Sequence, residues 1–559
     1  MTPASPIARV SWREEFIPKS LTVLREGYSL RFLQADALAG LTVAIVALPL
    51  SMAIAIASGV GPERGLFTAI VGGFLVSLLG GSRFQVGGPA GAFIILIAAC
   101  VMQTGFSGLA LATFLSGFML VALGLLRLGS YIRFIPYPVT VGFTAGIGVI
   151  IFASQIKDLF GLTLTGPEPG AFIAKLETMW HARDSFTPAA LAVTVGTIVL
   201  IEAIKRFLPR LPGMLIGVTV AAIVAALLGL PVETIHSRFG DLPRILPAPA
   251  LPHLSMDAIT EALPWAISFT LLGAIESLLS AIVADGMTGN QHRSNAELVA
   301  QGVANIGSAL FGGFCVTGTI ARTATNVRAG SHGPVSGMLH ALFVLAFMMV
   351  AAPLAGYIPL AALAGVLAIV AWNMIEKDEF KALMRSSRGD AMVLLVTFAL
   401  VVFRDLTEGI IVGFALGGLV FIRHMSEMTR IEAHSPAEGE MPPDPQGRDV
   451  VVYRLRGAMF FGAVARLGTV LDRIAQRPRA VVVDFSNVPL VDSTGARMVV
   501  TLAQKMRRRG AQLYVTGAAI EIRRALHAQG LHEPLALFLP DVATAVATVT
   551  PDSDESPKG

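Results

Sequence analysis

Apolar segments follow one another along the chain up to about Arg423, separated by short polar breaks. Most are long enough for a helix to cross a bilayer, which takes roughly 20 residues. The pattern therefore predicts an α-helical polytopic membrane protein with about 14 transmembrane segments. The expected spans begin near Asp36, Leu66, Gly87, Leu109, Pro138, Ala189, Met214, Leu263, Ala296, Gly318, Val335, Ile358, Ala391 and Thr407.

The spans are predicted to form two inverted seven-span repeats. Phe134-Ile-Pro136 and Tyr357-Ile-Pro359 each open a span, and Gly80-Gly81 and Gly312-Gly313 each precede a span broken by glycines. If each half contains seven spans, each broken span is the third in its half. Because seven is odd, the second half crosses the membrane in the orientation opposite to the first. Interrupted segments at matching positions of two inverted halves point to the binding site of a transporter.

Beyond the last span the pattern changes to that of a small α/β domain. Strand-length apolar runs begin at Val450, Ala480 and Gln512, and amphipathic helical stretches alternate with them. We therefore expect a cytoplasmic N-terminal segment (1–31), a transmembrane domain (32–430), a polar, proline-rich linker (431–448), the α/β domain (449–550) and a disordered tail (551–559).

Charge gives the orientation and excludes several functions. Lys and Arg gather in alternate loops, which the positive-inside rule places in the cytoplasm of a bacterial inner membrane, together with both termini. Charged residues are 14% of the chain, against about 25% in globular proteins. The net charge of +4 is spread over many loops and gives no support for nucleic-acid binding. The sequence offers no P-loop, catalytic constellation or metal-ligand cluster, so we expect neither an enzyme nor a cofactor or metal.

The two broken spans are the first candidate site. Gly87 and Gly88 let the backbone turn, and Pro89 suits a first helical position. Two helices that begin near the membrane midplane would present free N–H groups and positive dipole ends to an anion. The alternative is that these glycines only allow tight helix packing. The predicted substrate-binding residues are Ala90, Gly91, Ala92, Phe93, Gly318, Thr319, Ile320, Ala321 and Arg322.

Glu276 is the second candidate, because it lies in the middle of the apolar run Leu263 to Ala284. A carboxylate at this depth is costly and marks an ion or substrate pathway. Ser280 lies one turn further on the same helical face, so the pair is predicted to couple transport to a proton or to Na⁺. A structural role is the alternative, either as a hydrogen bond to another helix or as an ion pair with Arg322.

Three further polar motifs have local interpretations. Ser294-Asn-Ala-Glu297 has the spacing of a capping box at the start of a span, and Asn305 is predicted to make an interhelical hydrogen bond. In the α/β domain, Asp492-Ser-Thr-Gly495 precedes a helix and can cap it. A phosphate on Thr494 would also be stabilised at that helix N-terminus, which makes Ser493 and Thr494 candidate regulatory residues.

Several motifs together resemble the sulfate permease (SulP) family of anion transporters. The motif Asp492 to Gly495 resembles the signature of the sulfate transporter and anti-sigma antagonist (STAS) domain. The transmembrane stretches that carry the resemblance are Leu79 to Phe93, Phe134 to Gly146, Ile275 to Asp285 and Gln301 to Gly313. The resemblance implies a core and a gate domain, a substrate between the starts of the third and tenth spans, and a homodimer.

Departures from the family pattern bear on the substrate. The sodium-coupled bicarbonate branch carries an Asp-Ser-Leu-Leu-Thr motif, whereas this chain has Glu276 and Ser280 at the matching ends. That difference resembles the branch thought to move C4-dicarboxylates with protons. Leu50 stands where many eukaryotic relatives have glutamine, and Ala90 stands where a threonine is frequent.

The sequence thus predicts a secondary active anion transporter that moves by an elevator-like displacement of core against gate. A C4-dicarboxylate carried with H⁺ is ranked first, with Na⁺ as the second choice of ion; sulfate ranks second and bicarbonate third. The alternatives are an uncoupled anion exchanger or channel, and a membrane-anchored signalling protein whose STAS domain binds a cytoplasmic protein partner.

Overall fold

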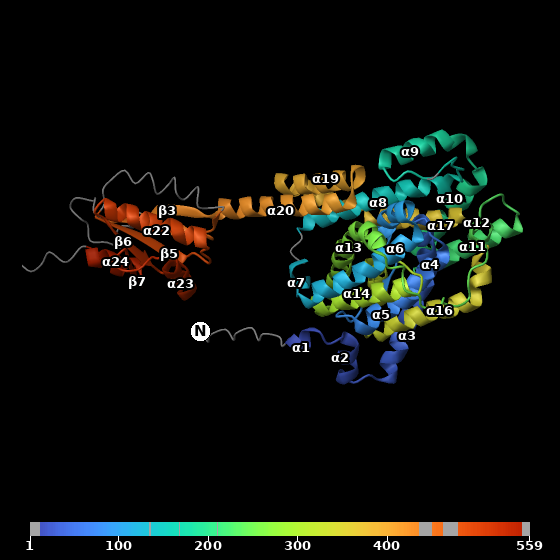
Figure 1. The fold of residues 1–559 in the computed structure, drawn as a ribbon, viewed down its shortest axis with the longest axis horizontal. Coiled ribbons are helices and arrows are strands. Elements are labelled where there is room, and N and C mark those ends of the chain that lie inside the picture. The colour runs from blue at the N-terminus through green and yellow to red at the C-terminus, as the bar shows by residue number, and fades with distance from the viewer. Residues whose placement is uncertain are drawn as a thin grey trace, which may run out of the picture. The chain divides into compact units, whose positions relative to one another are not determined.

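The computed structural model describes residues 12–132, 136–166, 168–209, 211–434, 450–461 and 479–549. The chain divides into two compact units, Met1–Phe414 and Ala415–Gly559 (Figure 1). The expected tail, most of the expected linker, and Phe134 and Ile135 of the repeated motif lie outside the described residues.

The membrane unit is a bundle of apolar helices. Nine helical stretches among the described residues are long and apolar enough to cross a bilayer. They comprise α3 (Leu30–Ala57), α4 and α5 (Pro62–Phe67, Gly73–Leu79) joined by a π-helical turn, α6 (Ile94–Leu125) with the 3₁₀ turn Gly91–Phe93, α8 (Tyr137–Phe160), α10 (Pro188–Phe207), α13 (Met256–Thr288), α16 (Val335–Ala355), α17 with α18 (Leu360–Met374, Lys377–Ser386) and α20 (Leu406–Met428).

The remaining spans come from a kink and from four shorter helices. Gly105, with φ of +69°, divides α6 into two arms, and glycine is the residue that adopts this conformation at least cost. The shorter helices are α11 (Gly213–Leu227), α14 (Ser294–Leu310), α15 (Ile320–Arg328) and α19 (Arg388–Phe403). The helical polytopic fold predicted from hydropathy is therefore confirmed, including the two short broken spans.

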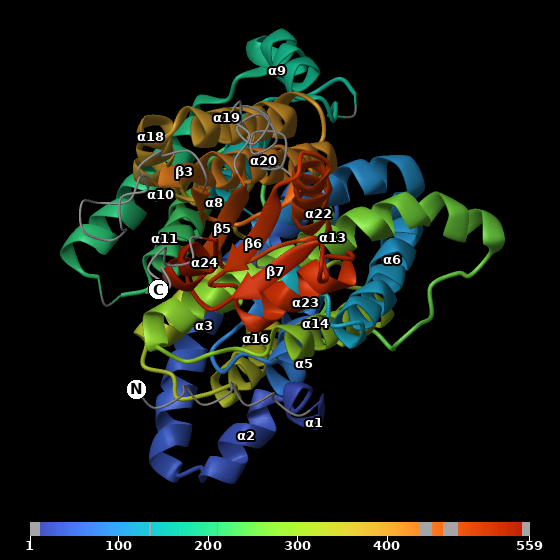
Figure 2. The same cartoon turned by 90° about the vertical axis from the view of Figure 1, so that its left-hand side faces the viewer.

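The helices gather into two bundles. The core bundle consists of α3 to α6 and α13 to α16, in which α6 packs on α13 and α14, and α3 on α16. The gate bundle consists of α8, α10, α11, α17, α19 and the first part of α20, in which α8 packs on α17 and α19. Both bundles can be followed in the two views (Figures 1 and 2). Among the described residues of the membrane unit, five short helices lie outside the spans: α1 (Trp12–Glu15), α2 (Lys19–Glu26), α7 (Gly129–Ile132), α9 (Phe172–His181) and α12 (Ile235–Phe239).

Small residues bring the core helices into close contact. A Cβ atom added to Gly302 of α14 would lie 2.4 Å from the carbonyl oxygen of Gly117 in α6. A Cβ on Gly117 would in turn lie 2.7 Å from the Gly302 carbonyl oxygen. Such backbone contact is how helices associate where lipid removes the hydrophobic driving force.

The second unit contains a five-stranded sheet in the order β3-β4-β5-β6-β7. Strand β3 is antiparallel to β4, and the other neighbouring pairs are parallel. Alternate residues of β5 face opposite sides, so that Val481 and Val483 pack with α22 while Val482 packs with α24. The elements are β3 (Arg430–His434), β4 (Val450–Arg456), β5 (Ala480–Asn487), α22 (Ser493–Arg508), β6 (Gln512–Thr516), α23 (Ile520–Ala528), β7 (Ala536–Leu539) and α24 (Val542–Val549).

The predicted α/β domain is thus present, and β3 shows one difference from the sequence expectation. Residues 431–434 were expected to start the linker, but they form most of β3, because their backbone pairs with β4 from Ile431↔Leu455 to His434↔Val452. Arg430 to His434 alternate polar and apolar residues, but five residues directly before the proline-rich stretch are too short a pattern to distinguish a strand from a linker.

Candidate anion and coupling site

The two broken spans meet in a two-stranded ladder inside the core bundle. Strand β1 (Gly87–Gly88) pairs antiparallel with β2 (Thr317–Gly318) in the register Gly87↔Gly318 and Gly88↔Thr317. The amide of Thr319 donates to the Val86 carbonyl over 3.1 Å and extends the ladder. The structure therefore joins the segments that the sequence placed at matching positions of the two repeats.

Each strand leads directly into a helix whose first turn has no side-chain cap. The 3₁₀ turn Gly91–Phe93 follows Ala90, and α15 follows Thr319; neither of these preceding residues caps its helix. The Thr319 hydroxyl instead donates to the Val86 carbonyl over 3.3 Å. Because the first amides of a helix have no intrahelical acceptor, both helix starts keep donors available. The amide of Phe93 is already used, since it donates to Ala90 over 3.1 Å.

Glycine is required at the crossing by close approach of side chains. A Cβ atom on Gly88 would lie 1.8 Å from Nη1 of Arg322, and one on Gly318 would lie 1.8 Å from Nε2 of Gln85. Long side chains thus lie flat against the strand backbone on both sides of the ladder. The hypothesis that the glycines serve packing and the hypothesis that they build a site are therefore compatible here.

Arg322 is buried with part of its guanidinium group unpaired. The side chain is 2% exposed, and its Nη2 donates to the Ser51 hydroxyl over 3.0 Å and to the Pro89 carbonyl over 3.3 Å. Its Nε and Nη1 atoms have no hydrogen-bond partner among the described residues. A buried guanidinium group with two unsatisfied N–H donors favours an anionic ligand.

Glu276 lies on the α13 face that contacts the crossing. One turn before it, the Gly273 carbonyl accepts from the Thr317 hydroxyl over 3.3 Å. One turn after it, the Ser280 hydroxyl donates to Thr323 over 3.1 Å. Residues three and four apart share a helical face, so Glu276 faces the crossing between these two contacts.

The carboxylate of Glu276 has no hydrogen bond and no ion pair within the described part of the chain, although the side chain is only 8% exposed. Arg322 does not pair with it, so the ion pair that was the structural alternative for Glu276 is absent from the described residues. The hydroxyl of Ser280 also bonds to Thr323 rather than to Glu276.

The start of the third span faces the gate bundle. A Cβ atom on Gly91 would lie 3.4 Å from Cδ1 of Ile151 in α8 and 3.7 Å from Sδ of Met374 in α17. The uncapped helix start is therefore at the boundary between core and gate bundles. Phe93 points the other way and packs on Phe269 of α13, with ring centroids 6.1 Å apart.

Two interpretations from the sequence need correction. The motif Ser294 to Glu297 is not a capping box, because the N-cap residue is Arg293 and no side chain caps the helix. Glu297 accepts instead from the backbone of Gly81 and Ser82. Asn305 does not bond to a neighbouring helix; it bonds to the carbonyl and amide of Val316, just before β2.

Several residues at the crossing escaped the sequence analysis. Ser51 holds Arg322, Thr323 accepts from the Val86 amide over 3.1 Å, and Gln85 donates to Glu297 over 2.9 Å. Ser51 lies two residues after Pro49 inside α3. A proline within an apolar helix was the one feature of the sequence that marked this position. The other two are polar residues within the glycine-broken stretches, where the residue type alone does not reveal a partner far away in the sequence.

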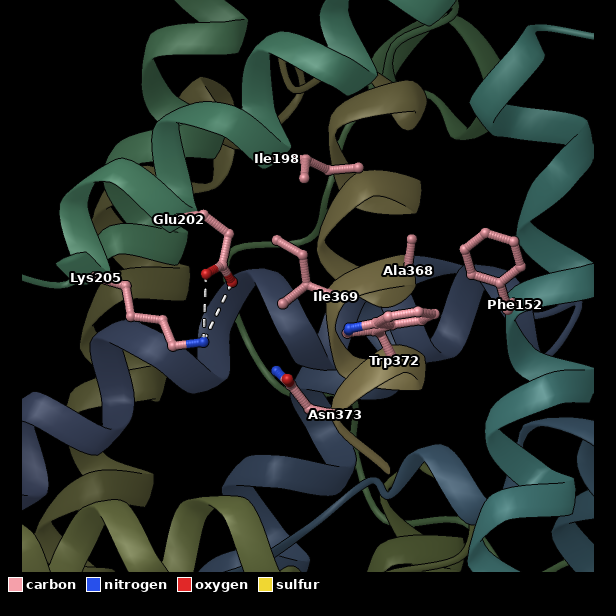
Figure 3. A pocket seen from close by; sticks show the side chains of 8 residues that line it. All are labelled: Phe152, Ile198, Glu202, Lys205, Ala368, Ile369, Trp372 and Asn373. Carbon is pink, nitrogen blue, oxygen red and sulfur yellow. Dashed lines mark hydrogen bonds and ion pairs between the residues drawn. The ribbon is translucent and has the colours of Figure 1, made fainter. Parts of the chain in front are cut away.

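One groove of the gate bundle is distinct from the crossing. It holds about 460 Å³ between α8, α10 and α17, and none of the predicted site residues lines it (Figure 3). Its polar side chains are Asn373 and the pair Glu202 and Lys205, whose Oε1 and Nζ atoms are 3.3 Å apart. The rest of the lining is apolar and includes the exposed side chains of Phe152 and Trp372. An apolar groove with a satisfied ion pair offers an anion little binding energy.

The predicted regulatory loop of the α/β domain begins helix α22. Oδ1 of Asp492 accepts from the Gly495 amide over 2.7 Å and caps the helix, while Oδ2 accepts from the Phe461 amide over 3.0 Å. Ser493 and Thr494 are exposed at the first helical positions. Asp492 alone therefore caps the helix, and the two hydroxyl groups are left accessible.

Comparison with known protein families assigns both units. Residues 33–397 match the sulfate permease family, and residues 442–545 match the STAS domain. The chain belongs to the sulfate permease family.

Curated members of the sulfate permease family align along most of the chain. The chain is 39% identical to the putative sulfate transporter YvdB of Bacillus subtilis, over 90% of this chain and 95% of that protein. It is 30% identical to the bicarbonate transporter BicA of Synechocystis, over 89% of this chain and 90% of that protein. These relatives are named for sulfate and bicarbonate rather than for dicarboxylates, contrary to the branch that Glu276 suggested.

Solved structures of the family share the fold. The inward-facing murine anion transporter Slc26a9 superposes with a TM-score of 0.84 at 19% identity, covering 98% of this chain and 96% of that one. The transmembrane domain of a cyanobacterial BicA superposes with a TM-score of 0.62 at 30% identity, covering 68% of this chain and 98% of that one. The protein is a sulfate permease family transporter and not an enzyme.

Proposed function

We propose that this secondary anion transporter carries sulfate together with protons, and that bicarbonate is the alternative substrate. The observation that carries the proposal is the pairing of β1 with β2, which brings two uncapped helix starts from opposite halves of the chain together beside Arg322. The same atoms would bind the anion: the free amides after Ala90 and after Thr319, with the guanidinium group supplying charge.

The charge of the site favours a dianion. Each helix N-terminus acts as about half a positive charge, and Arg322 adds a full one, so roughly two positive charges converge on the crossing. Sulfate and a C4-dicarboxylate both match that charge, whereas bicarbonate carries one negative charge. The names of the relatives then favour sulfate over a dicarboxylate, which reverses the order inferred from Glu276 and Ser280.

Glu276 supports protons as the coupling ion. A carboxylate with no hydrogen-bond or ionic partner in low-dielectric surroundings favours its protonated form. Sodium needs several oxygen ligands in a fixed arrangement, and Ser280, the predicted second ligand, is oriented toward Thr323, to which its hydroxyl donates a hydrogen bond, rather than toward Glu276. We therefore assign proton loading to Glu276 and a supporting role to Ser280, which holds α13 against α15.

Transport would proceed by displacement of the core bundle against the gate bundle. The contact of Gly91 with Ile151 and Met374 supports this, because the helix start lies against two gate helices. Substrate bound there would change its exposure when the bundles slide. A homodimer in a bacterial inner membrane, with both termini cytoplasmic, completes the proposal.

The STAS domain would act as the regulatory part of this transporter. The exposed hydroxyl groups of Ser493 and Thr494 are suited to phosphorylation, and the N-terminus of α22 would stabilise the added charge. A cytoplasmic protein that recognises this loop would be the partner of the domain.

Uptake by proteoliposomes under an imposed pH gradient, acid outside, tests the coupling. We expect the wild-type protein to accumulate labelled sulfate, and to lose accumulation when a protonophore collapses the gradient. Glu276→Gln should abolish accumulation but retain sulfate binding, because Gln cannot exchange a proton. Bicarbonate, succinate and fumarate are the competing anions.

Three outcomes would contradict the proposal. Gradient-driven uptake by Glu276→Gln equal to wild type would remove the coupling role. Sulfate flux with no dependence on a gradient would identify an uncoupled exchanger or channel. Accumulation of succinate in preference to sulfate would restore the dicarboxylate assignment.

A further inference from the structure

Helix α14 presents a row of buried polar side chains along one face. The row consists of Glu297, Gln301, Asn305 and Ser308, spaced by four, four and three residues, and such spacing keeps side chains on one face. None of the four is more than 2% exposed. A buried polar row inside a membrane protein is costly unless every member has a partner, so each partner matters.

Glu297 fixes the chain that leads into β1. Its Oε2 accepts from the amides of Gly81 and Ser82 over 2.8 and 3.0 Å. Its Oε1 accepts from Nε2 of Gln85 over 2.9 Å and from Nε2 of Gln301 over 3.0 Å. This carboxylate has four N–H donors, whereas Glu276 on the neighbouring helix α13 has none in the part of the chain that the structure describes.

Asn305 and Ser308 fix the chain that leads into β2. Nδ2 of Asn305 donates to the Val316 carbonyl over 2.9 Å, and its Oδ1 accepts from the Val316 amide over 3.0 Å. The hydroxyl of Ser308 donates to the Phe314 carbonyl over 2.7 Å. Asn305 therefore pairs with Val316 as an adjacent strand would.

The glycine pairs that mark the two repeats each include a glycine that lies close against this helix. A Cβ atom on Gly81 would lie 2.1 Å from the Arg293 carbonyl oxygen and 2.9 Å from the Glu297 amide nitrogen. A Cβ on Gly313 would lie 2.4 Å from the Ser308 hydroxyl. In each repeat, the residue that lies against α14 is therefore a glycine, because a side chain would not fit there.

We propose that Glu297 and Asn305 are positioning residues, which hold the backbone of both half-helix starts on one rigid helix and so set the geometry of the anion site. The proposal rests on the function proposed above, because it concerns the same site. Neither side chain binds the anion; each acts through the segment that it holds.

The role requires a carboxylate at position 297, in its ionised form. Four N–H groups converge on its two oxygens, and a protonated acid or an amide would turn a donor toward donors. The fixed charge of Glu297 thus contrasts with the exchangeable proton assigned to Glu276. One carboxylate serves geometry and the other serves coupling.

Hydrogen–deuterium exchange of the full-length protein in lipid nanodiscs tests the positioning without any substrate. Glu297→Gln should raise exchange of the amides at 81–88 by roughly tenfold or more, the scale expected for lost charged hydrogen bonds. Asn305→Ala should raise exchange at 316–319. Glu202→Gln, which alters an exposed carboxylate of α10, is the matched control and should change neither segment.

Sulfate affinity measured on the same preparations links position to binding. Glu297→Gln should weaken sulfate binding by roughly tenfold or more, and Gln85→Met, which removes one donor and keeps the carboxylate, should weaken it less. The exchange Glu297→Gln with Gln301→Glu keeps one buried carboxylate but moves it one turn away from Gly81 and Ser82. This double variant should remain defective.

The outcomes separate the proposals. Unchanged exchange at 81–88 in folded Glu297→Gln, or full recovery of affinity in the double variant, would overturn the positioning role. If Glu297→Gln does not fold, Gln85→Met and Asn305→Ala decide, and wild-type exchange and affinity in both would overturn it. Failure of the wild-type protein to bind any tested anion would instead overturn the proposed function, while the exchange data still judge the positioning role.

Discussion

At the scale of single residues, two buried carboxylates on neighbouring helices have opposite surroundings. Glu297 is held by N–H donors from the segment before β1 and from α14 itself, and Glu276 has no partner among the described residues. A fully bonded carboxylate cannot take up a proton without breaking bonds, whereas an unbonded one can. The division of tasks between them therefore follows from their partners and not from their depth in the membrane.

The contact between Gly88 and Arg322 gives a prediction at this scale. Gly88→Ala places a methyl group where Nη1 now lies, 1.8 Å from the new Cβ, so the guanidinium group has to move away from the crossing. We expect sulfate affinity to fall by about tenfold or more, since a charged hydrogen bond contributes about 1.5–3 kcal/mol.

Isothermal titration of the purified variant with sulfate measures this effect. Gly196→Ala is the control, because a Cβ there has no atom within 4 Å, and its affinity should equal that of wild type. Unchanged affinity in Gly88→Ala would show that Arg322 does not face the anion.

At the scale of elements, α14 is the helix on which the core bundle is built. It carries the polar row toward both broken segments and packs through Gly302 against Gly117 of α6. Gly302 is needed on the face toward α6, and the polar row is needed on the face toward the broken segments. Few positions of α14 can therefore be substituted without loss of a contact.

Gly302→Ala tests the packing side. The new Cβ would lie 2.4 Å from the Gly117 carbonyl oxygen and 2.7 Å from the amide nitrogen of Val121. Backbone atoms cannot swing aside, so α6 and α14 have to separate. We expect a loss of roughly 1–3 kcal/mol, measured as a lower melting temperature in detergent, while a melting temperature equal to that of Gly196→Ala would contradict it.

Strand β5 of the STAS domain gives a pH-dependent prediction. Burial alone would raise the pKa of Asp484, but bonds from the Ser486 hydroxyl and amide and from Arg454 outweigh it, so the net pKa is lowered. A lowered native pKa stabilises the fold above the unfolded value and is lost as pH falls through the native pKa. The contribution is therefore complete above the ordinary value of 3.8 and disappears below it.

Hydrogen exchange in β5 and β6 of the full-length protein measures this. Protection should fall with acid below about pH 4 in wild type. Asp484→Asn should be less protected at neutral pH and should lack that acid-dependent step. An identical acid dependence in the variant would assign the step to another group.

The helices and broken segments could be predicted from the sequence, but the contacts between distant residues could not. Hydropathy and the glycine pairs found the spans and the two broken segments, because both signals are local. The partners of Glu297 could not be found in this way, since Gly81 and Ser82 lie in the other half of the chain. The local capping rule consequently gave the wrong partner, and Ser51 beside Arg322 was missed for the same reason.

At the scale of the whole molecule, the proposed movement requires the core bundle to slide on the gate bundle. One side-chain contact between them is the hydroxyl pair of Ser268 in α13 and Thr407 in α20, whose oxygens are 3.2 Å apart. A disulfide at this place would tie the bundles together.

We predict that Ser268→Cys with Thr407→Cys, in a background lacking Cys100 and Cys315, forms a disulfide under oxidation and arrests sulfate uptake. Reduction should restore uptake, and each single cysteine variant should be insensitive to oxidant. Continued uptake by the fully cross-linked protein would contradict a sliding core.

The ladder between β1 and β2 also constrains how the protein is made. Its strands come from the third and the tenth span, so the first half of the chain is inserted long before its partner strand exists. During that interval the amides of Gly81 and Ser82 lack the carboxylate of Glu297, and β1 lacks its partner strand. A chain that ends after seven spans therefore lacks both the partner strand and the carboxylate that complete the site.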